Sequence, residues 1–276
     1  KMKKVLLIGV SGFIGKNLYD YLSPNYKVYG ISRSNVPYDN CEQIDVLNKT
    51  ELLNYFRNKN FDVVINLAAV LAKSNNLDDI EILLDNLSIT NNLVEGLKTY
   101  QDTHLINFSS SSVYANSSGN YNEQALIDPA ENGDCIYGLS KFNSEILFRY
   151  LLKKHEINVT NLRVPMVYGA KMDKTRIHKT FETELEENNT ISIWGNGERI
   201  ISHISVNELV VKVDKIITNK IYGTYNLMGE SISLIKLAER IINKKKGGDS
   251  KVVLVDKGSK SKFVLDGTQL DKLLND

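Results

Sequence analysis

Val5-Leu6-Leu7-Ile8-Gly9-Val10-Ser11-Gly12-Phe13-Ile14-Gly15 is the stretch that decides the predicted fold. Its apolar start has the length of one buried strand, and a helical pattern over 13–22 follows the glycine-rich turn. In this context the three glycines predict a dinucleotide-binding fingerprint. Gly9 permits the tight turn, Gly12 lets the backbone approach a pyrophosphate, and Gly15 lets helix and strand pack closely. The free N–H groups at the start of the helix then face the phosphates.

Beyond this unit, short β-rich runs alternate with helical patterns, which predicts βαβ units around a parallel sheet. We expect strands at 5–9, 27–32, 62–67, 104–109 and 159–163, with helices at 45–58, 80–100 and 138–155 between them. The fold class is therefore α/β, a Rossmann-like doubly wound parallel sheet.

The alternation changes after Val167-Tyr168-Gly169, which predicts a smaller C-terminal substrate-binding lobe. Its expected elements are helices at 171–189, 208–218 and 234–246 and strands at 191–194 and 200–206, with the 200–218 stretch rejoining the main sheet. We expect the dinucleotide-binding domain at 1–168 plus about 200–222, and the lobe at about 169–199 and 223–276.

Composition excludes several classes of protein. The 276 residues carry 34 Lys+Arg against 33 Asp+Glu, so no charge excess favours nucleic acid or an anionic membrane. Cys41 and Cys135 form no CxxC and no metal-like cluster, which is typical of a reducing compartment and predicts no metal. No apolar run approaches the length of a membrane span. We expect a soluble cytoplasmic protein.

The end of the second predicted strand bears on the choice of cofactor. NAD sites usually place a carboxylate there for the ribose 2′-OH, whereas NADP sites place an arginine near the 2′-phosphate. Here Ser32 occupies the acid's position and Arg33 follows it. The sequence favours NADP(H) over NAD(H).

Tyr137-Gly-Leu-Ser-Lys141 and the serine run 109–112 carry the predicted chemistry. Residues four apart share one helix face, so the lysine's charge is expected to lower the pKa of the tyrosine. A serine hydroxyl from a strand end would hold a carbonyl oxygen while the tyrosine moves a proton.

With these motifs in place, the chain resembles an extended short-chain dehydrogenase/reductase of the nucleotide-sugar epimerase/dehydratase/reductase group, over nearly its whole length. The stretches that carry the resemblance, besides the glycine turn, are Asn66-Leu-Ala-Ala69, Asn86, Phe108-Ser-Ser-Ser-Ser-Val-Tyr114, Tyr137-Gly-Leu-Ser-Lys141 with Glu145, Leu162-Arg-Val-Pro-Met-Val-Tyr-Gly169, Gly195-Asn-Gly197, Val206-Asn-Glu-Leu209 and Gly223-Thr-Tyr-Asn-Leu227.

The resemblance implies a catalytic set of Ser110, Tyr137 and Lys141, in which Ser110 lies four residues before the tyrosine of the Val-Tyr pair. The cofactor-binding residues it implies are Gly9, Ser11, Gly12, Phe13, Ile14, Gly15, Ser32, Arg33, Asp45, Val46, Leu67, Ala68, Ala69, Asn86, Tyr137, Lys141, Val164 and Val167. The substrate-binding residues are Ser111, Ser112, Val70, Met166, His178, Trp194 and Arg199. Asn86 has an alternative role in bridging helix turns.

Departures from the family pattern narrow the reaction. Dehydratases follow the catalytic hydroxyl with Asp-Glu, but this chain has Ser111 and Ser112, which are too weakly acidic for elimination. The GDP-fucose synthase branch pairs a cysteine with a histidine for epimerisation. This chain has Ser112 at the cysteine's position, with His178 near that of the histidine, so this kind of epimerisation is disfavoured. What remains is reduction of a 4-keto(-6-deoxy) nucleotide sugar, in deoxysugar and surface polysaccharide (O-antigen) synthesis.

Three alternatives stay open. A C4 epimerase of nucleotide sugars would hold NAD tightly, a regulator would bind NADP without catalysis, and another oxidoreductase would act on a non-sugar carbonyl.

In the lobe, the family's diphosphate-contacting arginine falls on Ile201, and Arg199 is the expected substitute. Arg176, Lys174 and Lys179 offer further positive charge. The family also implies a homodimer through two helices, the one that contains Ile146 and Tyr150 and the one that precedes the serine strand.

Overall fold

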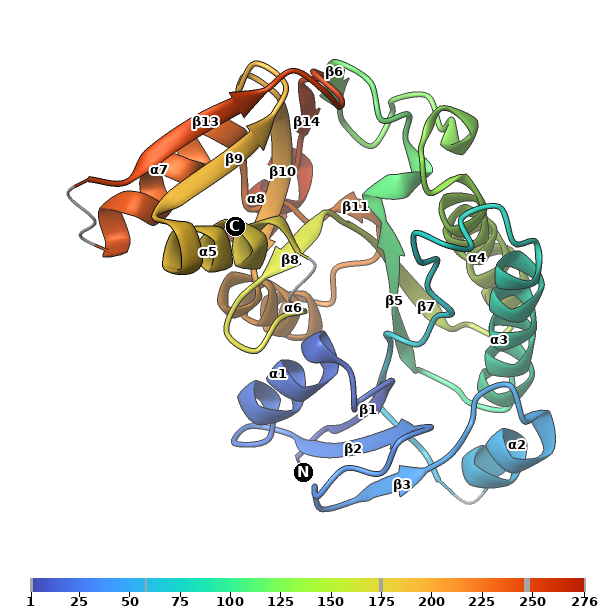
Figure 1. Ribbon diagram of the computed structural model, residues 1–276. Coiled ribbons are helices and arrows are strands. Elements are labelled where there is room, and N and C mark those ends of the chain that lie inside the picture. Colours follow the sequence, from blue (N-terminus) through green and yellow to red (C-terminus); the bar gives the residue numbers. More distant parts are fainter. Residues whose placement is uncertain (1, 58, 174–175, 246–248, 276) are drawn as a thin grey trace.

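The computed structural model describes residues 2–57, 59–173, 176–245 and 249–275, and at its centre lies a parallel sheet of seven strands (Figure 1). The strand order is β11-β7-β5-β4-β1-β2-β3, so the chain winds outward in both directions from β1. The fold class predicted from the sequence is confirmed. The strands are β1 (Lys4–Ile8), β2 (Lys27–Ser32), β3 (Cys41–Gln43), β4 (Val63–Asn66), β5 (His104–Ser110), β7 (Asn158–Val164) and β11 (Gly223–Asn226).

Helices cover both faces of this sheet, which is why its strands are apolar almost throughout. In β1, Val5 and Leu7 join the cluster on one face, while Leu6 and Ile8 join the cluster on the other. The first face carries α1 (Phe13–Leu22), α6 (Val206–Asn219) and α8 (Thr268–Asn275), and the second carries α2 (Lys49–Arg57), α3 (Glu81–Leu97) and α4 (Cys135–Lys153).

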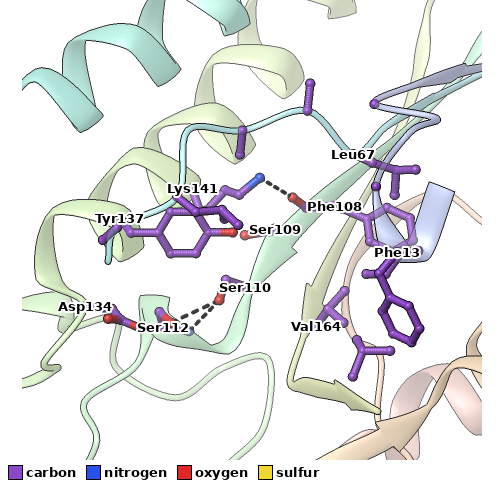
Figure 2. Close-up of a pocket in the computed structure, with 18 of the residues that line it drawn as sticks. Phe13, Leu67, Phe108, Ser109, Ser110, Ser112, Asp134, Tyr137, Lys141 and Val164 are labelled. Carbon is purple, nitrogen blue, oxygen red and sulfur yellow. Dashed lines mark hydrogen bonds between the residues drawn. The ribbon is translucent and has the colours of Figure 1, made fainter. Parts of the chain in front are cut away.

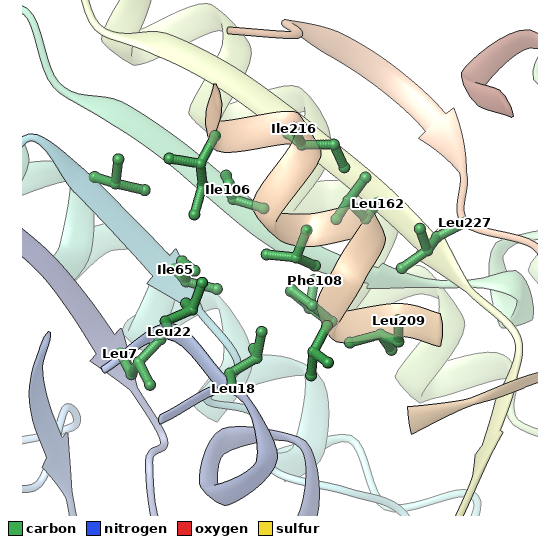
Figure 3. Packing of buried hydrophobic residues seen from close by; sticks show 14 of the residues in the cluster. Leu7, Leu18, Leu22, Ile65, Ile106, Phe108, Leu162, Leu209, Ile216 and Leu227 are labelled. Atoms are coloured by element: carbon green, nitrogen blue, oxygen red, sulfur yellow. The ribbon is translucent and has the colours of Figure 1, made fainter. Parts of the chain in front are cut away.

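Figure 3 shows the first face, where Leu18 of α1 and Leu209 of α6 lie over the sheet beside Phe108. Burying one such side chain stabilises the fold by about 1.5–3 kcal/mol. The packing of α1 and α6 therefore holds the glycine turn and the start of the C-terminal segments in one body.

Most of the remaining elements form the C-terminal part of the molecule, around a separate apolar cluster that includes Phe181, Ile191 and Leu237, while Tyr121 and Phe263 belong to a smaller cluster around Tyr114. A three-stranded sheet has the order β12-β10-β8, and two pairs, β13-β9 and β14-β6, flank it. These elements are β6 (Gly119–Tyr121), β8 (Met166–Tyr168), β9 (Thr190–Trp194), β10 (Ile200–Ser205), β12 (Glu230–Ser233), β13 (Lys251–Val255), β14 (Phe263–Leu265), α5 (Ile177–Asn188) and α7 (Leu234–Lys245), with short turns of 3-10 helix at η1 (Ser111–Val113) and η2 (Pro129–Glu131).

The structure differs from the predicted division of the chain in two respects. β10 does not rejoin the main sheet, because it pairs with β8 and β12. The seventh strand of the main sheet is instead β11, which the prediction had placed in the lobe and which pairs with β7. An apolar pattern identifies a strand but not its partner. The helix ends predicted at Asn58 and Lys246 lie outside the described residues.

Candidate active site

The carboxyl ends of the central strands meet the C-terminal segments around a cavity of about 790 Å³. This is the edge where doubly wound sheets bind their ligands. All but one of the predicted cofactor-binding residues line the cavity, and the exception is Asn86. The catalytic candidates Ser110, Tyr137 and Lys141 line it together, as do the substrate candidates Val70, Ser111, Ser112, Met166 and Arg199.

The glycine turn has the geometry of a pyrophosphate cradle. Gly9 has φ 90°, and its N–H donates to the carbonyl of Ile31 at 2.8 Å. A Cβ on Gly15 would lie 2.4 Å from the carbonyl oxygen of Gly9, whereas a Cβ on Gly12 would meet only that oxygen, at 3.4 Å. No side chain caps the N-terminus of α1. Its backbone N–H groups therefore suit the pyrophosphate of a dinucleotide.

The end of β2 presents no carboxylate to the cavity. Ser32 is buried, and its hydroxyl donates to the carbonyl of Ser34 at 2.7 Å. Arg33 is exposed and lines the cavity, while its carbonyl accepts a hydrogen bond from Gln43 at 2.8 Å. The guanidinium of Arg33 is therefore the charged group at this strand end.

Two elements bring the catalytic candidates together. β5 ends at Ser110, whose Oγ accepts from the N–H of Ser112 at 3.0 Å. Tyr137 and Lys141 lie one turn apart on α4, and Nζ of Lys141 donates to the carbonyl of Phe108 at 2.7 Å. Figure 2 shows the phenol of Tyr137 pointing toward the end of β5, where Ser110 lies.

Burial dominates the ionisation of both α4 residues. It raises the pKa of Tyr137 above its ordinary value, while the charge of Arg176 lowers that pKa and the charge of Asp134 raises it. Burial also lowers the pKa of Lys141 to about 8, against the opposing effect of Glu145. Burial therefore outweighs the lowering of the Tyr137 pKa that was expected from Lys141, whose Nζ bonds to a carbonyl and lies 5.7 Å from the centre of the ring.

Asn86 acts behind the cavity wall rather than in it. Its side-chain oxygen accepts from the N–H of Val70 at 2.8 Å, and its nitrogen donates to the carbonyl of the same residue at 2.9 Å. The nitrogen also bonds to Ser140, whose hydroxyl donates to the carbonyl of Tyr137. Asn86 therefore fixes the loop after β4 and ties it to α4.

Two predicted substrate residues lie away from the cavity. His178 is buried, stacks on Tyr168 at 4.3 Å between ring centres, and shares a hydrogen bond of 2.8 Å with His203. The structure does not place His178 at the cavity, as its predicted substrate-binding role requires, because its ring lies in the packing between α5 and β10. Trp194 is 57% exposed at the end of β9, with the ammonium of Lys257 over its ring.

The positive charge expected in the lobe reaches the cavity through two arginines. Arg176, just before α5, and Arg199, just before β10, both line it, as does Ile201. Nε of Arg199 is buried and has no hydrogen-bond partner among the described residues. Lys179 pairs with Glu182 instead, and Lys174 lies outside the described residues.

Sequence reasoning missed other parts of the wall. Asn116, Asn132 and Asp134 line the cavity beside Tyr137, and Phe263 reaches it from β14. The position of Asp134, one turn before Tyr137, was a signal available in the sequence. Nothing local marks Phe263, because its place depends on the pairing of β14 with β6.

Across the residues that the structure describes, there is no group of three or more His, Cys, Asp or Glu side chains suited to a metal ion. None of the helices in the same ranges combines the length and apolar character needed to cross a bilayer.

Comparison with known proteins agrees with this site. Residues 5–227 match the model of the NAD dependent epimerase/dehydratase family. That span covers the glycine turn, the serine run and the Tyr-Lys pair, and the chain is an enzyme that belongs to this family. The resemblance drawn from the sequence motifs is confirmed.

Individual relatives are distant. The chain is 27% identical to a dTDP-D-glucose 4,6-dehydratase of Dictyostelium discoideum over 88% of its own length, but it spans only 62% of that relative. It is 26% identical to a UDP-glucuronate 4-epimerase of Thermodesulfobacterium geofontis, over 87% of the chain and 81% of the relative. The crystal structure of a UDP-glucuronic acid 4-epimerase from Bacillus cereus, with UDP-glucuronic acid and NAD, has a TM-score of 0.83 at 24% identity, over 99% and 93% of the two chains.

Proposed function

We propose that this enzyme uses NADP(H) to reduce the carbonyl of a 4-keto(-6-deoxy) nucleotide sugar in deoxysugar and surface polysaccharide synthesis. The observation that carries the proposal is the meeting of Ser110, Tyr137 and Lys141 on one cavity whose Ser111 and Ser112 replace the acids of a dehydratase. A tyrosine proton donor beside a serine hydroxyl suits a ketone oxygen, but elimination of water needs stronger acids and bases.

The protein's own groups have separate tasks in this reduction. Ser110 hydrogen-bonds the ketone oxygen, and Tyr137 donates a proton to that oxygen as it becomes an alcohol. Burial raises the pKa of Tyr137 and so favours the protonated phenol, which is the form that reduction requires. Lys141, whose Nζ donates to the carbonyl of Phe108, would bond a ribose hydroxyl of the cofactor. When bound, the nicotinamide supplies the hydride.

The preference for NADP(H) rests on the end of β2. Ser32 offers no carboxylate to a ribose 2′-OH, and Arg33 offers a positive charge at the cavity rim for a 2′-phosphate. Turnover measured separately with NADPH and NADH tests this preference. A lower KM for NADH than for NADPH would contradict it.

The nucleotide-sugar substrate is proposed from the relatives and from the two arginines. Arg176 and Arg199 line the C-terminal side of the cavity, and the buried Nε of Arg199 lacks a protein partner among the described residues. A diphosphate satisfies such donors with charge-assisted hydrogen bonds. Replacing Arg199 with methionine should raise KM for the sugar nucleotide far more than KM for NADPH.

The central experiment supplies purified enzyme with NADPH and a panel of 4-keto CDP-, dTDP-, GDP- and UDP-sugars. Tyr137→Phe should abolish reduction while leaving NADPH affinity largely unchanged. Tyr150→Phe is the matched control, since Tyr150 lies on the same helix but is 76% exposed. Reduction that persists in Tyr137→Phe would refute the assigned role. Binding of NADPH without turnover of any sugar in the wild type would favour a non-catalytic regulator.

A C4 epimerase is the second candidate, because a relative and a structural neighbour are both UDP-glucuronate 4-epimerases. An epimerase needs no net reductant and holds its NAD through the whole cycle. Purified enzyme that carries bound NAD and interconverts 4-epimers without added NADPH would favour this candidate over reduction.

We also propose that the protein is a cytoplasmic homodimer that associates through α3 and α4. Leu84, Ile146 and Tyr150 of these helices are exposed apolar side chains. Cys41 and Cys135 are free thiols, which suits the reducing cytoplasm. Light scattering on the wild type and on Ile146→Glu measures the mass; a monomeric wild type would contradict the dimer.

A further inference from the structure

A buried ion pair lies behind the catalytic candidates. Arg163, at the end of β7, donates from Nε to Oε1 of Glu145 at 3.0 Å and from Nη2 to Oε2 at 2.8 Å. Glu145 and Arg163 are only 4% and 5% exposed. A buried ion pair is a poor source of stability, because the cost of desolvating two charges offsets most of their attraction. Its presence next to the active site therefore calls for another physical role.

The pair holds both ends of the segment that carries Ser110. At the first end, Oγ of Ser109 donates to Oε1 of Glu145 at 2.5 Å. At the other end, Nη1 of Arg163 donates to the hydroxyl of Tyr114 at 2.8 Å. Ser109 and Arg163 are register partners in β5 and β7, so the sheet itself aligns these contacts.

The same pair fixes α4 against β5. Lys141 and Glu145 lie one helical turn apart; the first bonds to the carbonyl of Phe108 and the second to the hydroxyl of Ser109. Two successive turns of α4 are thus hydrogen-bonded to two successive residues of β5. The separation between Ser110 on β5 and Tyr137 on α4 depends on these contacts.

The pair also bears on the charge of Lys141. Burial favours the neutral amine, and the Glu145 carboxylate favours the cation. Tyr137 and Glu145 act on Lys141 from its own helix, and Arg163 on β7 pairs with the Glu145 carboxylate. Beyond these, Asp134 and Arg176 act on Tyr137.

The contacts continue from Tyr114 into the C-terminal part of the chain. The Tyr114 hydroxyl donates to the side-chain oxygen of Asn226 on β11 at 2.9 Å, and the Asn226 amide donates to the carbonyls of Tyr121 and Asp266. The segment that holds Ser110 is therefore anchored to β6 and to the residue after β14 as well as to α4.

We propose that the Glu145–Arg163 ion pair is a positioning unit that clamps the 109–114 segment and α4 in one geometry. The Glu145 carboxylate, one helical turn from Lys141, also favours the charged form of that lysine. The proposal rests on the proposed function in that Ser110, Tyr137 and Lys141 are the groups positioned. Neither Glu145 nor Arg163 lines the cavity, so both act through other residues.

A double-mutant cycle tests the positioning role. Glu145→Gln should lower kcat by about 100-fold, since a displacement of about 1 Å at a reacting group has an effect of this size. Ser109→Ala removes one contact and should lower kcat less. If the pair acts through Ser110, the loss in Glu145→Gln/Ser110→Ala should fall far short of the product of the two single losses. Losses that multiply would overturn the proposal.

A binding measurement tests the effect on Lys141 and needs no sugar substrate. NADPH affinity, followed by fluorescence titration from pH 6 to 9, should weaken as the pH rises and Lys141 loses its charge. In Glu145→Gln this loss of affinity should occur at a lower pH than in the wild type. An unchanged pH profile would overturn this part of the proposal. Because this measurement does not depend on turnover, an enzyme that reduces none of the keto sugars refutes the proposed function but still allows this test.

Circular dichroism and melting curves accompany each variant. If Glu145→Gln does not fold, Ser109→Ala and Tyr114→Phe replace it. Ser109→Ala removes the hydrogen bond to Glu145 alone, whereas Tyr114→Phe removes the bond to Arg163 together with the one to Asn226. Asp271→Asn is the matched control, since it breaks the ion pair of Lys212 between α6 and α8, away from the cavity. Its kcat and pH profile should equal those of the wild type. A loss of kcat as large as that in Ser109→Ala would mean that breaking an ion pair far from the cavity has the same effect, and it would overturn the proposal.

Discussion

Alanine substitutions at Gly12 and Gly15 should separate cofactor binding from packing, although the two glycines lie three residues apart. A Cβ on Gly15 would lie 2.4 Å from the carbonyl oxygen of Gly9 and 2.8 Å from Cα of Val10. To restore a contact of 3.4 Å to that oxygen, the start of α1 must move by about 3.4 − 2.4 = 1.0 Å. Such overpacking costs about 1–3 kcal/mol, and the helix propensity of alanine offsets about 1 kcal/mol of it.

Gly12→Ala places its Cβ quite differently. The new atom meets only the carbonyl oxygen of Gly9, at 3.4 Å, and the backbone of Gly12, with φ −72° and ψ 167°, accepts any residue. Stability should therefore change by less than about 1 kcal/mol. The methyl group faces the cavity, where it would keep a pyrophosphate from the backbone. Losing one charge-assisted hydrogen bond of about 1.5–3 kcal/mol should raise the Kd for NADPH by about 10- to 100-fold.

Differential scanning fluorimetry and isothermal titration calorimetry measure the two effects. Gly12→Ala should keep the wild-type Tm and lose NADPH affinity, whereas Gly15→Ala should lower the Tm and also lose affinity. Wild-type affinity in Gly12→Ala would refute the assignment of the glycine turn as the pyrophosphate cradle. A wild-type Tm in Gly15→Ala would refute the account of its packing.

Three further outcomes are expected. Asp134→Asn removes a charge that raises the pKa of Tyr137, so the alkaline limit of ketone reduction should move to lower pH; a move to higher pH would contradict this effect. His104 is buried against Thr160, and burial lowers its pKa to about 4. Its contribution to stability is therefore complete above about pH 6.5 and is lost as the pH falls toward 4, by about 3 kcal/mol. His104→Gln should flatten the Tm measured between pH 7 and 4, and an equal slope in the variant would assign the effect to other groups. Arg33→Ala should raise KM for NADPH by about tenfold or more, because a charge-assisted hydrogen bond of about 1.5–3 kcal/mol is lost, and leave KM for NADH unchanged; equal changes for both cofactors would argue against contact with a 2′-phosphate.

Features confined to one element were predictable from the sequence. The bounds of α1 and β2 agree with the predicted ranges 13–22 and 27–32, because the apolar spacing that buries a helix or a strand is local. The glycine turn and the Tyr137–Lys141 pair were equally accessible, since each depends on residues within one turn or on one helix face. The resemblance to a family then led from the serine run to Ser110.

Long-range pairing decided the rest. β10 is the more apolar strand, yet it is β11 that completes the main sheet by pairing with β7, while β10 pairs with β8 and β12. That choice depends on which strands the tertiary fold brings side by side. Long-range packing also placed His178 against His203 and brought Phe263 to the cavity wall.

The ionisation of the site also belongs to the tertiary structure. Spacing along a helix shows that Tyr137 and Lys141 are neighbours, but the pKa of each depends on burial and on charges from other elements. The sequence by itself determined a dinucleotide fold with a tyrosine, a lysine and a serine run in suitable order. Only the folded chain decided that Glu145 and Arg163 meet behind them, because desolvation and ion pairing arise between segments that are distant in sequence.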